Sequence, residues 1–416
     1  MPSPAHKTSD TYRGELPSLT RRLDRYFERV KDDHPLKGTV PGPNAIELWS
    51  NDYLSLSDHP VITKAQADVL ASGKNSVFMS AAYLGDGTPQ RAIERQAAAF
   101  LGTEAVVLTQ SGWCANFGLI QSISNEQTPV YIDIFAHASL WEGARSVGAP
   151  IHPFRHNDAG SLEGSLKKSG PGIVIVDAIY SSNGTICSLA NILGVSEKFG
   201  CEVVVDESHS IGICGRNGQG MVSLLGLTDK VKYRTFSLSK AFVTRAGMVA
   251  GPARTMDYFR YESRPAIFSS AVLPHEIAGL AATVEVIQDE SWRRERLRKN
   301  TDYLRAHLNH LGYPVDTEGS QVIALEAGPE KRTVILRKAL ERRGVFGAVF
   351  CAPATPKNRS IVRLSVHCDL TEYQLDRIIE VCEEMRGEVE VENWPASLRY
   401  KSEPERPVRR AGIGTA

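Results

Sequence analysis

Residues 202–242, EVVVDESHSIGICGRNGQGMVSLLGLTDKVKYRTFSLSKAF, contain the pattern from which the fold class can be inferred. Two short apolar runs, 202–207 and 233–238, each lead into polar residues, and a helix-length segment separates them. Continuous apolar runs of this length are typical of strands that are buried on both faces, as in parallel sheets covered by helices. This stretch therefore predicts an α/β fold.

The same pattern extends to both sides of this stretch. Four further runs have the same character: AVVLT (105–109), VYIDIF (130–135), GIVIVDA (172–178) and GMVAG (247–251). Together the runs predict a mostly parallel large-domain sheet flanked by helices. Beyond Pro274 the apolar positions keep a helical period past Trp292, so we expect one long helix to leave the large domain. A smaller α+β C-terminal domain is expected after this helix.

We divide the chain into four parts. They are an N-terminal helix and linker segment (1–60), a large domain (61–290), a small C-terminal domain (291–395) and a flexible tail (396–416). An amphipathic helix is expected from Leu16 to about Val30, where apolar residues recur at helical spacing. The tail is expected to be flexible because it is charged and interrupted by proline.

The composition argues against several functional classes. The chain has 48 Lys and Arg against 48 Asp and Glu, so no net positive charge holds it to nucleic acid or to an anionic membrane. It shows no secretion signal and no apolar run long enough to cross a bilayer. The 7 cysteines are scattered and include no Cys-x-x-Cys pair. We expect a cytoplasmic protein with reduced thiols, no bound metal, no membrane span and no nucleic-acid partner.

Polar residues follow five of the apolar runs. In open α/β sheets, ligands bind at the carboxyl ends of the strands, so these residues predict one common site. They are Gln110 and Ser111, His137, Tyr180 and Ser181, Asp206 and His209, and Ser237 to Lys240.

Lys240 and Asp206 form a pair that suits pyridoxal phosphate. A lysine on a loop above the sheet can form a Schiff base with this cofactor, and a carboxylate can keep the pyridine nitrogen of the cofactor protonated. Asp206 follows a buried strand, where a carboxylate is costly without a cationic partner. Taken alone, these two residues are equally compatible with a solvated lysine and a strand-end aspartate in another α/β protein.

The segment SGWCAN (111–116) ends one apolar run and opens a helical stretch. Gly112 lets the backbone approach an anion closely, and the free amides at a helix start bind phosphate. Ser237 could add a hydroxyl to the same phosphate. By itself this segment could equally be a simple turn between a strand and a helix, and a lone His137 could be structural.

The order and spacing of these motifs resemble those of the α-oxoamine synthases, a branch of the fold-type-I pyridoxal-phosphate enzymes. The matching segments are NDYL (51–54), SGWCAN (111–116), HAS (137–139), DESH (206–209) and GRNGQG (215–220). The resemblance covers roughly residues 45–390. It implies an aspartate aminotransferase-like fold with a large domain that binds pyridoxal 5'-phosphate, and a homodimer with active sites at its interface.

The resemblance also implies roles for individual residues. The three implied catalytic residues are Lys240, which would carry the cofactor, Asp206, which would face its pyridine nitrogen, and His137, which would stack on its ring. Arg363, assisted by Asn51, would grip the substrate carboxylate, because a planar guanidinium can pair both carboxylate oxygens.

Further contacts are implied with the phenolic oxygen and the phosphate of the cofactor. The phenolic oxygen would be contacted by His209 and Ser181, and the phosphate by Ser111, Gly112, Trp113, Ser237, Ser269 and Ser270. Ser269 and Ser270 would reach this phosphate across the dimer interface.

Residues 76–84, SVFMSAAYL, depart from the pattern of most α-oxoamine synthases, which have a Gly/Ser-rich stretch ending in a basic residue. Here, as in PAIFSS (265–270), the sequence resembles the quorum-sensing autoinducer synthases of the cholerae type. Phe78, Met79 and Tyr83 could then line a pocket for a fatty chain together with Leu84, where a charged group would be unfavourable. The alternative is that these side chains pack in the core.

This second resemblance implies an acyltransferase. It would condense a medium- or long-chain acyl-CoA with a small amino donor, 2-aminobutyrate or S-adenosylmethionine, to give an α-amino ketone signal molecule. Three alternatives stay open. They are a housekeeping α-oxoamine synthase such as 8-amino-7-oxononanoate synthase or glycine C-acetyltransferase, an aminotransferase or lyase of the same fold, and a non-catalytic partner subunit or regulator. The presence of Lys240 argues against the last.

Overall fold

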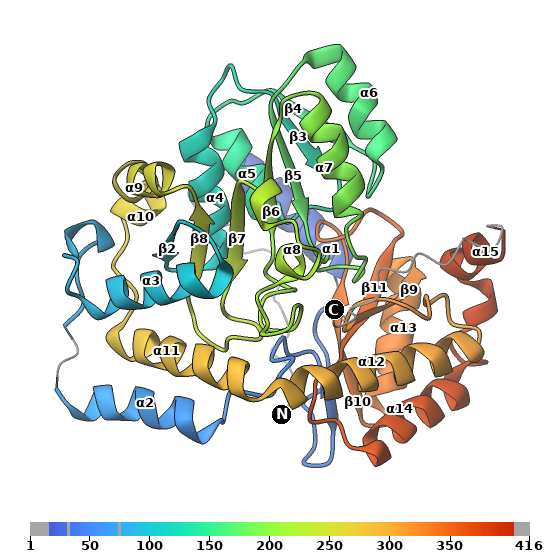
Figure 1. Cartoon of the computed structure of the whole chain (residues 1–416). Coiled ribbons are helices and arrows are strands. Elements are labelled where there is room, and N and C mark those ends of the chain that lie inside the picture. Colours follow the sequence, from blue (N-terminus) through green and yellow to red (C-terminus); the bar gives the residue numbers. More distant parts are fainter. Residues whose placement is uncertain (1–15, 31–33, 74–75, 403–416) are drawn as a thin grey trace.

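The computed structural model describes residues 16–30, 34–73 and 76–402, and it contains two sheets (Figure 1). The larger sheet has 7 strands in the order β2-β8-β7-β6-β5-β3-β4. Their bounds are β2 Ala105–Thr109, β3 Val130–Asp133, β4 Ile151–Phe154, β5 Ile173–Asp177, β6 Glu202–Asp206, β7 Tyr233–Ser237 and β8 Gly247–Gly251. Only β8 runs antiparallel to its neighbours, so the predicted mostly parallel sheet is confirmed.

All six predicted runs form strands of this sheet, and β4 was not predicted. Its sequence, IHPF, is short, contains Pro153 and is only partly buried. A proline is tolerated there because β4 lies at the edge of the sheet, where one side of the strand has no ladder to complete.

Helices cover both faces of the large sheet, which explains why the apolar runs of its strands show no alternation with polar residues. Along β5, Val174 and Val176 pack into one apolar cluster, whereas Ile173 and Ile175 pack into another. The first cluster includes residues of α3 Pro89–Leu101, α6 Ala159–Ser169, α7 Leu189–Lys198 and α11 Pro274–Asp289. The second includes residues of α4 Gly112–Ile123, α5 Ala138–Ser146 and α9 Ala253–Glu262.

The smaller sheet has 4 strands in the order β1-β10-β11-β9. Their bounds are β1 Ile46–Leu48, β9 Val322–Gly328, β10 Val345–Phe350 and β11 Ser360–Ser365, and they pack with α12 Ser291–His310, α13 Glu330–Glu341 and α14 Glu372–Met385. β1 pairs in parallel with β10, and the other pairs are antiparallel. The expected α+β unit is therefore present, but one of its strands comes from the N-terminal segment.

The single long helix expected beyond Pro274 is wrong, because α11 and α12 are separate helices. Glu290 between them has φ −101° and ψ 59°, outside the helical region. Arg293 donates from its Nε to the carboxylate of Glu290 at 2.5 Å and from Nη1 to the Leu54 carbonyl at 2.9 Å. In Figure 1 the two helices run along one side of the molecule and join the domains.

The flexible tail expected from residue 396 is also wrong for its first residues. Helix α15 spans Pro395–Ser402 and follows the buried Trp394, whose indole N–H donates to the Val389 carbonyl at 2.8 Å. Ser397 is buried as well and donates to the Val391 carbonyl at 2.7 Å. Residues 403–416 lie outside the described residues.

The remaining helices are α1 Pro17–Val30, α2 Pro60–Ala71, α8 Met221–Leu224 and α10 Arg264–Ile267, with short 3₁₀ turns at Ala81–Tyr83, Thr228–Lys230 and Val391–Asn393. α1 confirms the predicted N-terminal helix. Within the described ranges, none of the helices is both long and apolar enough to cross a bilayer. The same ranges contain no group of three or more His, Cys, Asp or Glu side chains that could hold a metal ion.

Candidate active site

Asp206 is the last residue of β6, and both of its carboxylate oxygens accept hydrogen bonds. The Asn116 side-chain amide donates to Oδ2 at 2.6 Å, and the Ser208 backbone N–H donates to Oδ1 at 2.8 Å. The Asn116 amide also donates to the Ser139 hydroxyl at 2.9 Å. This buried carboxylate is therefore held in one orientation, as a partner for a cation requires.

Lys240 lies in the loop that follows β7 and is half-buried. Burial lowers the pKa of Lys240 to about 8, although the carboxylates of Asp206 and Asp177 act in the opposite direction. The guanidinium of Arg363 lowers this pKa further. The structure therefore brings Lys240, Asp206 and Arg363 within electrostatic reach of one another and leaves about a tenth of the amine neutral at about pH 7.

This pKa predicts how the apoprotein takes up pyridoxal phosphate at different pH. Only the neutral amine attacks an aldehyde, so the uptake rate should rise with pH through about 8 and level off by about pH 9. Stopped-flow absorbance of cofactor uptake between about pH 6 and about pH 10 measures this profile. A rate that keeps rising toward 10.5, the ordinary lysine value, would contradict the burial of this amine.

His137 caps the N-terminus of α5 and faces the same residues. Its Nδ1 lies 2.7 Å from the Ser139 hydroxyl, and its ring meets Trp113 edge-on with centroids 6.1 Å apart. Burial lowers the pKa of His137, Asp206 raises it and Lys240 lowers it, so the imidazole is neutral at neutral pH. A neutral ring next to Lys240 and Asp206 suits the stacking role expected for it.

Asp177 is a residue of this site that the sequence did not indicate. It is the last residue of β5 and the register partner of Asp206 on β6. Its Oδ1 accepts a hydrogen bond from the His137 backbone N–H at 3.2 Å. Burial raises the pKa of Asp177 well above its ordinary value, and the Asp206 carboxylate adds to this shift.

A second set of contacts connects Arg363 with His209. Arg363, on β11, donates from Nη2 to the Asn51 side-chain oxygen at 2.7 Å and from Nη1 to the Ser181 carbonyl at 2.8 Å. The Tyr53 hydroxyl donates to the same Asn51 oxygen at 3.1 Å and lies 2.7 Å from His209 Nδ1. Hydrogen bonds thus connect Arg363 and Asn51, which are predicted to bind the substrate, with His209, which is predicted to contact the phenolic oxygen of the cofactor.

Burial shifts the pKa values of His209 and Tyr53 in this chain of contacts. It lowers the pKa of His209 well below its ordinary value, with Lys240 and Arg363 acting in the same direction, so His209 is neutral. It raises the pKa of Tyr53 to about 12, so the phenol keeps its proton. Asn51 was predicted, but Tyr53 was noted only as part of the NDYL motif.

The predicted phosphate-binding residues also come together. Ser111 caps α4, with its hydroxyl accepting the Cys114 backbone N–H at 3.2 Å. A Cβ atom on Gly112 would lie 2.4 Å from the Ser237 Cβ, and one on Gly247 would lie 2.3 Å from the Ser111 carbonyl oxygen. Only glycine allows the start of α4 to approach β7 and β8 this closely, which leaves an open helix N-terminus for an anion.

Ser269 and Ser270 lie near this helix start within the same chain. The Gln110 side-chain amide donates to the Ser270 carbonyl at 2.8 Å, and the Ser269 hydroxyl donates to the Pro265 carbonyl. Their predicted contact with a partner subunit stays a prediction.

Residues 76–84 place their large apolar side chains outward. Phe78 is 47% exposed, Met79 76% and Tyr83 70%, whereas Leu84 is only 6% exposed. Packing in the core, the alternative considered above, is therefore wrong for the first three residues and correct for Leu84. The Ala271 backbone N–H donates to the Phe78 carbonyl at 3.0 Å, so this segment lies beside residues 265–271.

The site fits pyridoxal phosphate in its donors as well as in its charges. Arg363 Nε and Asn116 Oδ1 are buried and make no hydrogen bond within the described residues. Such atoms are costly to leave without a partner, and both belong to residues of the candidate site. The arrangement offers an amine with a lowered pKa, a fixed carboxylate, a helix start for a phosphate and a guanidinium for a carboxylate.

Comparisons with known proteins agree with this arrangement. The family described as "Aminotransferase class I and II" matches residues 43–381. The CAI-1 autoinducer synthase of Vibrio campbellii is 43% identical over 383 residues, which cover 91% of this chain and 97% of that protein. The 8-amino-7-oxononanoate synthase 1 of Bacillus velezensis is 31% identical, with 85% and 91% covered.

A solved structure shows the same fold. The serine palmitoyltransferase from S. paucimobilis, in a variant with a bound PLP-myriocin aldimine, superposes with a TM-score of 0.83. The two proteins are 23% identical, and the match covers 91% of this chain and 100% of that chain.

Proposed function

Because the chain belongs to the family of class I and II aminotransferases, as a relative of the α-oxoamine synthases, we propose that it is an acyl-CoA:amino acid C-acyltransferase. It is a pyridoxal-phosphate enzyme. In this proposal it condenses a medium- or long-chain acyl-CoA with 2-aminobutyrate or S-adenosylmethionine and yields an α-amino ketone signal molecule. The 43% identity with an autoinducer synthase over nearly the whole of both chains carries this choice.

The proposal assigns the cofactor to residues already described. Lys240, Asp206 and His137 would hold its ring, His209 and Ser181 would face its phenolic oxygen, and the start of α4 with Ser237 would hold its phosphate. When bound, pyridoxal phosphate supplies an electron sink for the negative charge that develops on the substrate Cα.

The protein side chains then handle the substrate and its proton. Arg363, on β11 beside Asn51, binds the amino acid carboxylate. Lys240 Nζ, whose pKa is lowered to about 8, accepts the Cα proton as a general base from its neutral form. The substrate Cα then attacks the acyl thioester, coenzyme A leaves, and loss of carbon dioxide gives the α-amino ketone.

Exposed apolar side chains support a fatty substrate and a homodimer. Phe78, Met79 and Tyr83 are joined by Phe268, which is 82% exposed in the neighbouring segment 265–271. A surface of this kind is unfavourable in water and suits either a partner subunit or an acyl chain. In the proposed homodimer, Ser269 and Ser270 contact the phosphate site of the partner, and these apolar side chains line the acyl site.

The test is release of coenzyme A thiol by the loaded enzyme over a series of acyl-CoA chain lengths and a panel of amino acids. The panel includes 2-aminobutyrate and S-adenosylmethionine. Release should be confined to medium and long chains. Activity only with pimeloyl- or acetyl-CoA would identify a housekeeping synthase, and no release with any pair would favour an aminotransferase or a non-catalytic subunit.

Phe78→Glu sharpens this test. A carboxylate beside a fatty chain is expected to lower kcat/KM for the preferred long acyl-CoA by about tenfold or more, with a smaller effect on acetyl-CoA. The matched control is Val61→Glu on α2, where the side chain is 51% exposed, similar to Phe78. An equal loss for all chain lengths would contradict the proposed acyl site.

A further inference from the structure

Gln321 connects the small domain with the candidate site. It directly precedes β9, is 1% exposed, and donates from its side-chain Nε2 to the His209 carbonyl at 3.0 Å. The same side chain lies beside Tyr53 and lowers the pKa of this tyrosine against the larger effect of burial. Its backbone carbonyl accepts the Val366 N–H at 2.9 Å, which ties it to the end of β11.

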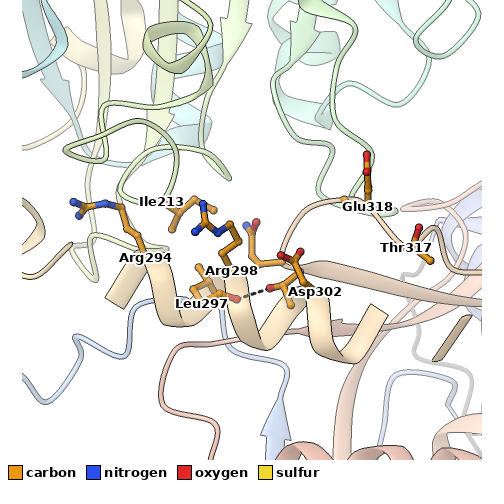
Figure 2. Close-up of a pocket in the computed structure, with 10 residues that line it drawn as sticks. Ile213, Arg294, Leu297, Arg298, Asp302, Thr317 and Glu318 are labelled. Carbon is orange, nitrogen blue, oxygen red and sulfur yellow. Dashed lines mark hydrogen bonds between the residues drawn. The ribbon is translucent and has the colours of Figure 1, made fainter. Parts of the chain in front are cut away.

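A cavity of about 300 Å³ adjoins Gln321 between the two domains (Figure 2). Ile213 of the large domain, Arg298 and Asp302 of α12, and the loop with Thr317 and Glu318 surround it. Gln321 Oε1 is buried and makes no hydrogen bond within the described residues. The position of this amide therefore depends on its bond to the His209 carbonyl, because open volume and not packed side chains lies beside it.

Counting the protons fixes the direction of the hydrogen bonds around Tyr53. The hydroxyl has one proton, which it donates to Asn51 Oδ1 at 3.1 Å. Its oxygen then accepts from His209 Nδ1, 2.7 Å away. Because His209 is neutral, Nδ1 carries the ring proton and Nε2 is left as an acceptor.

From these contacts we infer that Gln321 is a positioning residue, which fixes the backbone of His209, and thereby the place of its ring, from the small domain. This inference rests on the proposed function, in which His209 faces the phenolic oxygen of pyridoxal phosphate. An acceptor at Nε2 sets where the proton shared with that oxygen resides. Through Gln321, the protonation state of the bound cofactor thereby depends on the position of the small domain.

The other charged or titratable groups that act on His209 come from several elements. They are Lys240 after β7, Arg363 on β11 and His137 at the start of α5. All three are placed by contacts that do not involve Gln321, so its removal should shift the ring of His209 without removing these charges.

The experiment replaces Gln321 with methionine, which keeps the length of the side chain and removes the amide hydrogen bond to the His209 carbonyl. Visible absorbance of the loaded enzyme is titrated with pH, and kcat and KM are measured with the preferred substrates. We expect a shifted pH midpoint of the cofactor absorbance and a roughly three- to tenfold lower kcat, with KM for the amino acid nearly unchanged. Thr317→Ala, at another wall of the same cavity, should leave the midpoint and kcat as in the wild type.

A wild-type midpoint and kcat in folded Gln321→Met would overturn the inference, and so would equal shifts in Thr317→Ala. If circular dichroism shows that Gln321→Met does not fold, Gln321→Glu is tested in its place. Glutamate has the same shape as glutamine, and when ionised it cannot donate a hydrogen bond to the His209 carbonyl. The inference then requires the same shift in this variant. Failure of the proposed function is distinct, because the wild type itself would then show no cofactor absorbance or no thiol release.

Discussion

Lys240→Ala is expected to lose all coenzyme A release, a fall of about 10³-fold or more, together with the visible absorbance of lysine-bound pyridoxal phosphate. In the proposed function this side chain both holds the cofactor and accepts the substrate proton, and its pKa of about 8 suits the second task. Thiol release and the absorbance spectrum measure the two losses.

Lys232→Ala is the matched control for this variant. Lys232 precedes β7, whereas Lys240 follows it, and it pairs with Glu202 at the surface. Its removal should leave the spectrum and turnover unchanged. Measurable turnover in purified Lys240→Ala would refute the assignment of this lysine.

Asp206→Asn is expected to bind pyridoxal phosphate and to lose about 10²- to 10³-fold in kcat. The amide keeps the size of the carboxylate but removes the charge that would hold the pyridine nitrogen protonated. It also disturbs the hydrogen bond that Asn116 donates to Oδ2 at 2.6 Å. Cofactor affinity by absorbance titration and kcat by thiol release separate binding from chemistry.

Glu202→Gln serves as the control for Asp206→Asn. It removes an acidic group at the other, exposed end of the same strand. Turnover in this variant should match the wild type. Full activity in Asp206→Asn would show that the cofactor ring lies elsewhere.

The large sheet could be predicted because its strands are buried on both faces. Ile173 and Val174, for example, point into different apolar clusters, and both are apolar. Such a strand therefore appears in the sequence as a continuous apolar run, without alternating polar residues. β1 and β4 have no such signal. β4 is an edge strand with a proline, and β1 has three residues whose partner, β10, lies far along the chain.

The residues of the site that stand in recognisable motifs could be predicted. The residues that only position them through hydrogen bonds could not. Lys240 and Asp206 stand at strand ends, where their chemistry is visible in the sequence. Asn116 and Asp177 act through contacts with Asp206 and His137, which arise only when α4, β5 and β6 meet. One signal for Asn116 was available, since it is a polar residue within the mostly apolar helix GWCANFGLIQSI.

The helix break at Glu290 and the helix α15 escaped prediction for a common reason. Both depend on contacts with distant residues, namely Arg293 with the Leu54 carbonyl and Trp394 in the core of the small domain. Local periodicity carries no information about such contacts.

The pairing of β1 with β10 has a consequence for how the protein is made. Ile46 leaves the ribosome early, but its partner Val345 follows only about 15 to 60 s later at ordinary rates of synthesis. Asn51 and Tyr53 are also synthesised well before Arg363, which emerges later still and contacts Asn51. A nascent chain can therefore complete its large sheet while the substrate end of its site is still unformed, and a chain terminated before β11 would never form that end.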